Sequence, residues 1–296
     1  MKISKAIIPI AGRGTRFLPA TKAVAKELIP IINVPMVYYV VQEAVQAGMD
    51  QVIFITSDEK EAVLNFFDQD LALELFLKSA GKEKELEMVR KLSQQIEIIS
   101  IRQKQALGLG HAILQASPLI ASHENFAVLL ADDLVVSQGQ PAIAQLAHES
   151  QQLADAPVIG IMEVASSEIH RYGIIEGKSI NPKTYQVQRM LEKPALDETD
   201  SCLACPGRYI LPAEIMEILK QTPKGAGGEY QLTDAIDVMS KKKKTYAHLF
   251  EGERFDTGNI HGYLDAVIAF SLREPDLKKT LLQSIEKRIP DLGAKK

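Results

Sequence analysis

Short apolar runs alternate with stretches of helical periodicity through the first half of the chain. Four of these runs are predicted to be strands: 6–10, 51–56, 97–102 and 126–130. Between them the spacing predicts helices over 37–47, 59–67, 71–95 (with a break near Gly81) and 109–116. Strands that are apolar at nearly every position are typical of sheets buried on both faces. The alternation therefore predicts a parallel sheet with helices on both of its faces.

The second half of the chain is less regular. Its apolar runs predict strands at 158–164, 172–176, 187–191, 208–211 and 246–250. Helices are predicted over 212–220 and 231–240, with a helical tail from about residue 260. No internal repeat or low-complexity linker divides the chain. We expect one continuous α/β domain over 1–270, with halves of about 1–150 and 151–258, and a C-terminal tail over 259–296.

Composition and charge narrow the class of protein. The chain has 296 residues, of which 46% are hydrophobic and 24% charged, as in ordinary globular proteins. A net charge of −4 gives no electrostatic footprint for nucleic acid or for a membrane surface. Two cysteines, Cys202 and Cys205, are too few for a disulfide scaffold, and no suitable histidine cluster accompanies them to bind zinc. With no apolar run of membrane-spanning length and no targeting segment, we expect a cytoplasmic protein.

The first predicted strand leads into a glycine-rich turn. Gly12 and Gly14 stand in the sequence Ala11-Gly12-Arg13-Gly14-Thr15-Arg16. The turn is not a dinucleotide fingerprint, because Phe17 stands where a third glycine is needed, and it is not a G-x-x-x-x-G-K-[ST] loop. By itself it predicts either a tight turn or a phosphate-binding loop. Four cations in and after it favour phosphate, because ligands of open α/β sheets bind at the carboxyl ends of strands: Arg13, Arg16, Lys22 and Lys26.

A longer segment at this point resembles the signature of bacterial UTP–glucose-1-phosphate uridylyltransferases. It reads Ala11-Gly12-Arg13-Gly14-Thr15-Arg16-Phe17-Leu18-Pro19-Ala20-Thr21-Lys22-Ala23. Further blocks follow in the family's order between residues 5 and about 270: Lys26-Glu27-Leu28-Ile29-Pro30, Gly108-Leu109-Gly110-His111-Ala112, Ala131-Asp132-Asp133-Leu134, Tyr172-Gly173, Glu192-Lys193-Pro194, Gly207-Arg208-Tyr209, Gly225 to Ile236, and Asp256-Thr257-Gly258. Each block alone is modest, but the ordered set is specific.

The resemblance implies a fold and a reaction. The fold would be a Rossmann-like mixed, mostly parallel sheet flanked by helices, of the nucleotide-diphospho-sugar transferase type. The reaction would be attack by glucose 1-phosphate on the α-phosphorus of UTP, giving UDP-glucose and pyrophosphate, with Mg²⁺ as the cofactor. The first half of the domain would bind the nucleotide and the second half the sugar phosphate. Relatives are oligomers, so a homodimer or homotetramer is expected.

The same resemblance implies roles for charged residues. Arg16 and Lys26 match the family's catalytic cations, and Lys193 matches the residue that holds the sugar phosphate. Asp132 and Asp256 match the metal ligands, and Mg²⁺ is typically held by one or two carboxylates plus phosphates and water. Without the resemblance, an acidic pair such as Asp132-Asp133 would equally fit a helix cap or a solvated turn.

The remaining matches are to ligand-binding positions. Those for the nucleotide are Ala11, Gly12, Gly14, Glu27, Gln103 and Gly108. Those for the sugar are Gly173 and Glu192, together with Lys193. Two of these have plain alternatives, since Gln103 also fits a polar strand end and Glu192 could simply pair with Lys193.

The chain departs from the family pattern at several positions without losing a predicted catalytic group. The departures are Arg13, Ala25, Val34 and Cys205-Pro206. Two other functions stay open: a related enzyme that uses another nucleotide, such as dTTP, and a non-catalytic subunit that binds nucleotide sugars. The block from Gly225 to Ile236 favours the UTP branch. The complete set of predicted cations and carboxylates favours catalysis.

Overall fold

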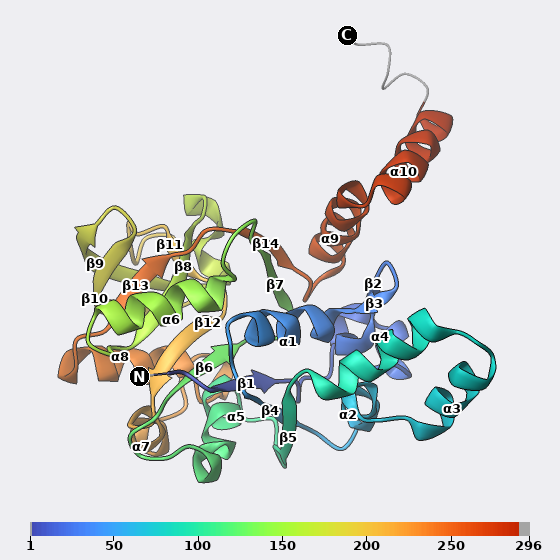
Figure 1. Cartoon of the computed structure of the whole chain (residues 1–296). Helices are drawn as coiled ribbons and strands as arrows, with labels where there is room; N and C mark the ends of the chain where they lie inside the picture. The colour runs from blue at the N-terminus through green and yellow to red at the C-terminus, as the bar shows by residue number, and fades with distance from the viewer. Residues whose placement is uncertain (1, 290–296) are drawn as a thin grey trace.

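The computed structural model describes residues 2–289, and its centre is one ten-stranded sheet (Figure 1). The strand order is β11-β9-β10-β13-β8-β12-β6-β1-β4-β5. The bounds are β1 (Lys5–Pro9), β4 (Gln51–Thr56), β5 (Glu97–Arg102), β6 (Asn125–Leu129), β8 (Val158–Glu163), β9 (Gly173–Asn181), β10 (Thr184–Glu192), β11 (Leu203–Cys205), β12 (Arg208–Pro212) and β13 (Tyr246–Leu249).

The two halves of the sheet are built differently. Strands β6, β1, β4 and β5 run parallel, as their connecting helices require. Strand β12 joins them antiparallel to β6, and beyond it only β8 and β13 pair in parallel. Strands β9 and β10 form a long antiparallel hairpin. The predicted mixed sheet is confirmed, with its parallel part in the first half of the chain.

Helices cover both faces of the sheet. One face carries α1 (Met36–Gln46) and α6 (Ala142–Gln152), and the other carries α5 (Leu109–Gln115), α7 (Ile215–Gln221) and α8 (Leu232–Lys242) (Figure 1). Both faces must be covered because successive apolar residues of β1 point to opposite sides of the sheet. Ile7 packs into one core and Ile8 into the other. Beyond the β5 edge lie α2 (Glu61–Phe67), α3 (Leu71–Ser79) and α4 (Glu83–Gln94), with the predicted break at Gly81.

Some elements differ from the sequence prediction. A small second sheet pairs β7 (Asp133–Val136) with β14 (Glu253–Asp256), and neither strand was predicted. Helix α6 was also not predicted, because its buried positions include the small Ala142 and the polar Ser150 and so weaken the apolar stripe. A third two-stranded sheet joins β2 (Pro30–Ile31) to β3 (Val34–Pro35).

Two helices end the described chain and extend away from the sheet (Figure 1). They are α9 (Ile260–Arg273) and α10 (Pro275–Arg288). They confirm the predicted helical tail as far as residue 288, while its last residues, 290–296, lie outside the described part. Among residues 2–289 no helix has the length and apolarity that a bilayer crossing requires.

Candidate functional site

The loop after β1 owes its shape to Gly14. This residue has φ +65°, and a Cβ atom there would lie 2.9 Å from Cβ of Lys26. Glycine therefore lets the short 3-10 helix η3 (Lys26–Leu28) pack against the loop, and the Thr21 hydroxyl donates to the Gly14 carbonyl at 2.8 Å. Gly14 is not among the residues that line the cleft described next.

The other predicted site residues line two adjoining hollows. The smaller hollow, of about 230 Å³, is lined by Ala11, Gly12, Lys26, Glu27, Gln103 and Gly108 among others. The larger, of about 720 Å³, is lined by Arg16, Asp132, Gly173, Glu192, Lys193 and Asp256 among others. Leu109 and Glu229 line both, so the two form one continuous cleft. The residues predicted for the nucleotide thus gather at one end of the cleft and those predicted for the sugar at the other.

An ion pair joins the two ends. Lys26 donates from Nζ to Oδ2 of Asp132 at 2.7 Å. Burial by itself lowers the pKa of Lys26, but the carboxylates of Asp132 and Glu27 outweigh burial and raise it. Burial likewise acts to raise the pKa of Asp132, and the charge and hydrogen bond of Lys26 more than reverse this. Both groups are therefore held in their charged forms.

Asp132 and Asp256 face a common point beside Gly258. A Cβ atom on Gly258 would lie 2.9 Å from Asp132 Oδ2 and 3.2 Å from Asp256 Oδ1. The missing side chain leaves a small space flanked by two carboxylate oxygens, and such oxygens are the ligands that Mg²⁺ prefers. Among residues 2–289 no group of three or more acidic, histidine or cysteine side chains could hold a metal. The donor set fits a divalent cation that takes its other ligands from phosphates and water.

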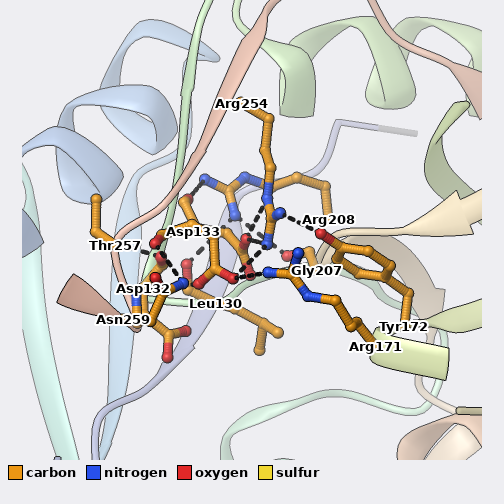
Figure 2. A network of polar contacts seen from close by, with 12 residues as sticks. Leu130, Asp132, Asp133, Arg171, Tyr172, Gly207, Arg208, Arg254, Thr257 and Asn259 are labelled. Atoms are coloured by element: carbon orange, nitrogen blue, oxygen red, sulfur yellow. Dashed lines mark hydrogen bonds and ion pairs between the residues drawn. The ribbon is translucent and has the colours of Figure 1, made fainter. Parts of the chain in front are cut away.

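Asp133 has a different environment from its neighbour. It is buried and forms an ion pair with Arg254, whose Nε donates to Oδ1 at 2.6 Å (Figure 2). Burial raises the pKa of Asp133 to about 7, with a further contribution from Asp132, against the opposing charge of Arg254. Asp133 also lines the larger hollow, but its carboxylate is already paired with Arg254.

Behind these carboxylates lies a fully buried arginine. Arg208 donates to both carboxylate oxygens of Glu43, with Nη2–Oε2 at 2.8 Å, and also to the Asp133 carbonyl at 2.5 Å and the Leu130 carbonyl at 3.3 Å. These bonds tie helix α1 and strand β12 to the loop that carries Asp132. Their role was not predicted, although Arg208 stands in the Gly207-Arg208-Tyr209 block of the sequence.

A second buried ion pair lies at the nucleotide end. Lys60 donates to Glu27 Oε2 at 2.6 Å, and both side chains are buried. The other carboxylate oxygen, Glu27 Oε1, has no hydrogen-bond partner among residues 2–289. Sequence reasoning missed Lys60, which carries no signal beyond its place after the buried strand β4. The pair fixes Glu27 in the wall of the smaller hollow.

Gln103 is held by its neighbours in the same wall. Its side-chain nitrogen lies 3.3 Å from the Gly108 carbonyl and 2.9 Å from Nδ1 of His111. A carbonyl oxygen only accepts, so the amide nitrogen is correctly placed on that side. Gln103 therefore lines the hollow with its amide held in one orientation.

At the other end, Glu192 and Lys193 pair with each other, as the plain alternative anticipated. Lys193 Nζ lies 3.3 Å from Glu192 Oε1, and the Thr233 hydroxyl donates to Glu192 Oε2 at 3.0 Å. The Lys193 side chain is still 57% exposed, so its ammonium group can reach a ligand in the cleft. The pairing and the ligand-binding role are compatible.

Two arginines of the cleft were not predicted. Arg171 lies 3.0 Å from Asp256 Oδ2, and Arg254 donates to the Tyr172 hydroxyl at 2.8 Å. The Tyr172-Gly173 block pointed to this region but not to its charges. Arg254 lies on β14, a strand that the apolar pattern did not reveal.

Of the sequence departures, Cys205 and Pro206 line the larger hollow, while Arg13, Ala25 and Val34 line neither hollow. Arg13 is exposed, and Cys205 is buried, with its pKa raised to about 11 by that burial. Cys202 and Cys205 are both free thiols in the structure. Larger hollows of about 1070 and 980 Å³ lie beside α6 and beneath α9, and neither is lined by a predicted site residue.

Comparison with known proteins identifies the family. The family model described as Nucleotidyl transferase matches residues 5–271. The chain belongs to the nucleotidyl transferase family. The prediction that it is an enzyme is thereby confirmed, and the relatives described next confirm its fold class and its resemblance to the bacterial uridylyltransferases.

Individual relatives cover nearly the whole of this nucleotidyl transferase. The UTP–glucose-1-phosphate uridylyltransferase of Staphylococcus epidermidis is 44% identical over 280 residues, which are 95% of this chain and 96% of the relative. A crystal structure of UDP-glucose pyrophosphorylase complexed with UDP-glucose superposes with a TM-score of 0.85 at 37% identity, covering 92% of this chain and 100% of the other. A UTP-bound UGPase from Acinetobacter baumannii gives a TM-score of 0.88 at 36% identity, covering 96% and 99%.

Proposed function

We propose that this nucleotidyl transferase transfers a uridylyl group from UTP to glucose 1-phosphate, giving UDP-glucose and pyrophosphate. The observation that carries the proposal is the single cleft in which Arg16, Lys26 and Lys193 lie with two carboxylates that flank Gly258. The names and bound ligands of the relatives supply the identity of the substrates.

The chemistry needs positive charge more than it needs a protein nucleophile. Glucose 1-phosphate is mostly a dianion at neutral pH, because its second pKa is about 6, and it must approach a triphosphate. Arg16 is exposed and lines the larger hollow, so its planar fork is available to the triphosphate. Lys26 offsets the charge that develops at the α-phosphate, and Lys193 holds the attacking sugar phosphate. Together they keep the attacking oxygen in line with the leaving pyrophosphate.

Asp132 and Asp256 would hold Mg²⁺ beside Gly258. The metal would supply charge neutralisation of the phosphates. The uracil would lie in the smaller hollow against Ala11, Gly12, Glu27, Gln103 and Gly108, and the glucose against Gly173 and Glu192. Residues 1–270 would act as one catalytic domain, a division supported by the sheet that runs through both halves.

A pyrophosphate-release assay tests the reaction. Four nucleoside triphosphates would be crossed with glucose and galactose 1-phosphates, with Mg²⁺ present and after its removal by a chelator. We expect release to be fastest with UTP and glucose 1-phosphate and to require the metal. Preference for dTTP would replace the proposal with a thymidylyltransferase, and binding of UDP-glucose without any release would leave a non-catalytic subunit.

We further propose that the chain forms a homo-oligomer through α9 and α10. Helix α9 exposes a stripe of large apolar side chains four residues apart: Ile260, Leu264, Ile268 and Leu272. Helix α10 has no buried residue, and it carries acidic Asp276 in its first turn with Lys287 and Arg288 in its last. Antiparallel pairing of two copies about a two-fold axis would cover the stripe and place opposite charges together.

Light scattering coupled to size exclusion tests this assembly. We expect the wild type to elute as a dimer or tetramer and Leu264→Glu to elute as a smaller species. Leu196→Glu, which also alters an exposed leucine but lies outside the tail helices, is the control. A monomeric wild type would contradict the proposal.

A further inference from the structure

Each of the two carboxylates beside Gly258 is held by a different cation. Asp132 pairs with Lys26, and Asp256 pairs with Arg171 through Nη2 and Oδ2 at 3.0 Å. Without these partners, two carboxylates facing one small space would repel each other. The cations therefore stabilise the acidic pair in the chain by itself.

Arg171 is the more loosely held of the two arginines at Asp256. Its side chain is 41% exposed, and its other ion pair is with the exposed Glu168, at 2.7 Å from Nη1. Arg254, by contrast, is largely buried, pairs with Asp133 and lies 3.9 Å from Asp256 Oδ2. Figure 2 shows the ring of Tyr172 beside the guanidinium groups of both arginines. An exposed ion pair of this kind is worth little, so Arg171 can change partners at small cost.

Arg171 also lines the part of the cleft where the sugar phosphate is proposed to bind. It shares that lining with Arg16 and Lys193. An arginine has five N–H donors in a planar fork, and Arg171 uses only two nitrogens in its present contacts. The fork suits phosphate oxygens, which accept two parallel hydrogen bonds.

We propose that Arg171 is a substrate-contacting residue that holds Asp256 in the free enzyme and donates to a substrate phosphate once Asp256 is bound to a divalent cation. The proposal rests on the proposed function and adds a residue to it. Arg171 is then a competitor for Asp256 before substrate arrives and a ligand of the phosphate afterwards. Removal of Arg171 should therefore strengthen cation binding to the free enzyme but lower kcat/KM for the substrates.

The test is Arg171→Met, with Arg171→Lys to keep the charge without the fork. Arg189→Met is the control, because Arg189 is similarly exposed, faces Glu176 at 3.9 Å and does not line the cleft. Binding of Mn²⁺ to the nucleotide-free protein would be measured by electron paramagnetic resonance. We expect Arg171→Met to bind Mn²⁺ about two- to fivefold more tightly, the range of an exposed ion pair.

Steady-state kinetics with Mg²⁺ supply the second measurement. We expect kcat/KM to fall roughly tenfold or more in Arg171→Met, less in Arg171→Lys, and not at all in Arg189→Met. A rise of KM confined to glucose 1-phosphate would assign the contact to the sugar phosphate, and one confined to UTP would assign it to the nucleotide. Weaker Mn²⁺ binding together with lower activity would overturn the proposal, because Arg171 would then only orient Asp256. If neither the Mn²⁺ affinity nor kcat/KM changed, the proposal would also be overturned, because the Arg171–Asp256 contact would then be only a solvated ion pair.

The Mn²⁺ measurement needs no turnover, so it stands apart from the proposed function. If wild-type enzyme released no pyrophosphate from UTP and glucose 1-phosphate, the proposed function would fail. If it released pyrophosphate and Arg171→Met changed neither measurement, only the role of Arg171 would fail. Thermal unfolding of each variant checks that the fold is kept.

Discussion

The charges around Asp132 form two groups that differ in how completely they are satisfied. Arg208 is fully buried, and its guanidinium donates to both oxygens of Glu43 and to three backbone carbonyls. Arg16 and Lys193 line the cleft with their charged groups largely available. A buried charge must have its partners built into the fold, whereas a charge meant for a ligand must lack some of them. A charged group that holds the loop therefore has its hydrogen-bond partners within the fold. A charged group that is proposed to bind the phosphates lacks some of these partners.

The largest effect is expected from the buried group. Arg208→Met would leave Glu43 as a buried carboxylate without its cation, and breaking a buried pair typically costs about 3–5 kcal/mol. We expect the free energy of unfolding in urea to fall by that amount, with activity lost in parallel. The double variant Arg208→Met with Glu43→Leu should be more stable than Arg208→Met alone, since no charge is left unpaired. A double variant that is less stable than the single one would contradict this account.

The next effect should be on catalysis and not on folding. Lys26→Met removes a positioned cation from the reaction, and such a loss typically lowers turnover about 100-fold or more. We expect kcat for pyrophosphate release to fall by this factor while the unfolding midpoint changes little. Lys5→Met is the matched control, because Lys5 pairs with Glu124 at 2.8 Å with an exposure close to that of Lys26, but lies outside the cleft. Equal kcat losses in both variants would refute a special role for Lys26.

The same contrast explains what could be predicted from the sequence. Strand β4 and strand β5 have their predicted bounds, because apolar runs bounded by polar loops depend on local pattern alone. The residues of the cleft come from loops and strand ends far apart in the chain. They were found only because ordered blocks resemble a family. Ala11, Asp132, Gly173 and Asp256 are brought together by the central sheet and the small β7–β14 sheet.

The residues that the sequence did not reveal are those defined by their partners. Lys60 and Arg254 are single cations in polar or weakly patterned segments, and only the folded chain places them beside Glu27 and Asp133. Strands β7 and β14 are short and pair over a separation of more than a hundred residues, so the local hydrophobic pattern does not predict them. Tertiary pairing of this kind overrides local pattern.

A third prediction concerns the sugar end of the cleft. Lys193→Ala removes an ammonium group that already pairs with Glu192 at 3.3 Å. Because this pair exists before the substrate binds, the ammonium adds less to substrate binding than an unpaired one would. We expect KM for glucose 1-phosphate to rise about tenfold, the value of one charged hydrogen bond of about 1.5 kcal/mol, with KM for UTP unchanged. Lys241→Ala, which removes a similarly exposed lysine paired with Asp237, is the control. A rise confined to UTP would move Lys193 to the nucleotide.

The smallest expected effect tests whether a neutral group in the wall of the cleft follows the same rule. Thr233 donates to Glu192 Oε2 at 3.0 Å, so Thr233→Val keeps the shape of the side chain and frees one carboxylate oxygen. The loss of one hydrogen bond is worth about 1 kcal/mol, which predicts a rise of roughly fivefold in KM for glucose 1-phosphate. Thr184→Val is the matched control, because the buried Thr184 hydroxyl donates to Glu149 at 2.7 Å outside the cleft. If both variants lost only stability and KM stayed constant, Glu192 would belong with the buried, fold-holding charges and not with those that face the substrate.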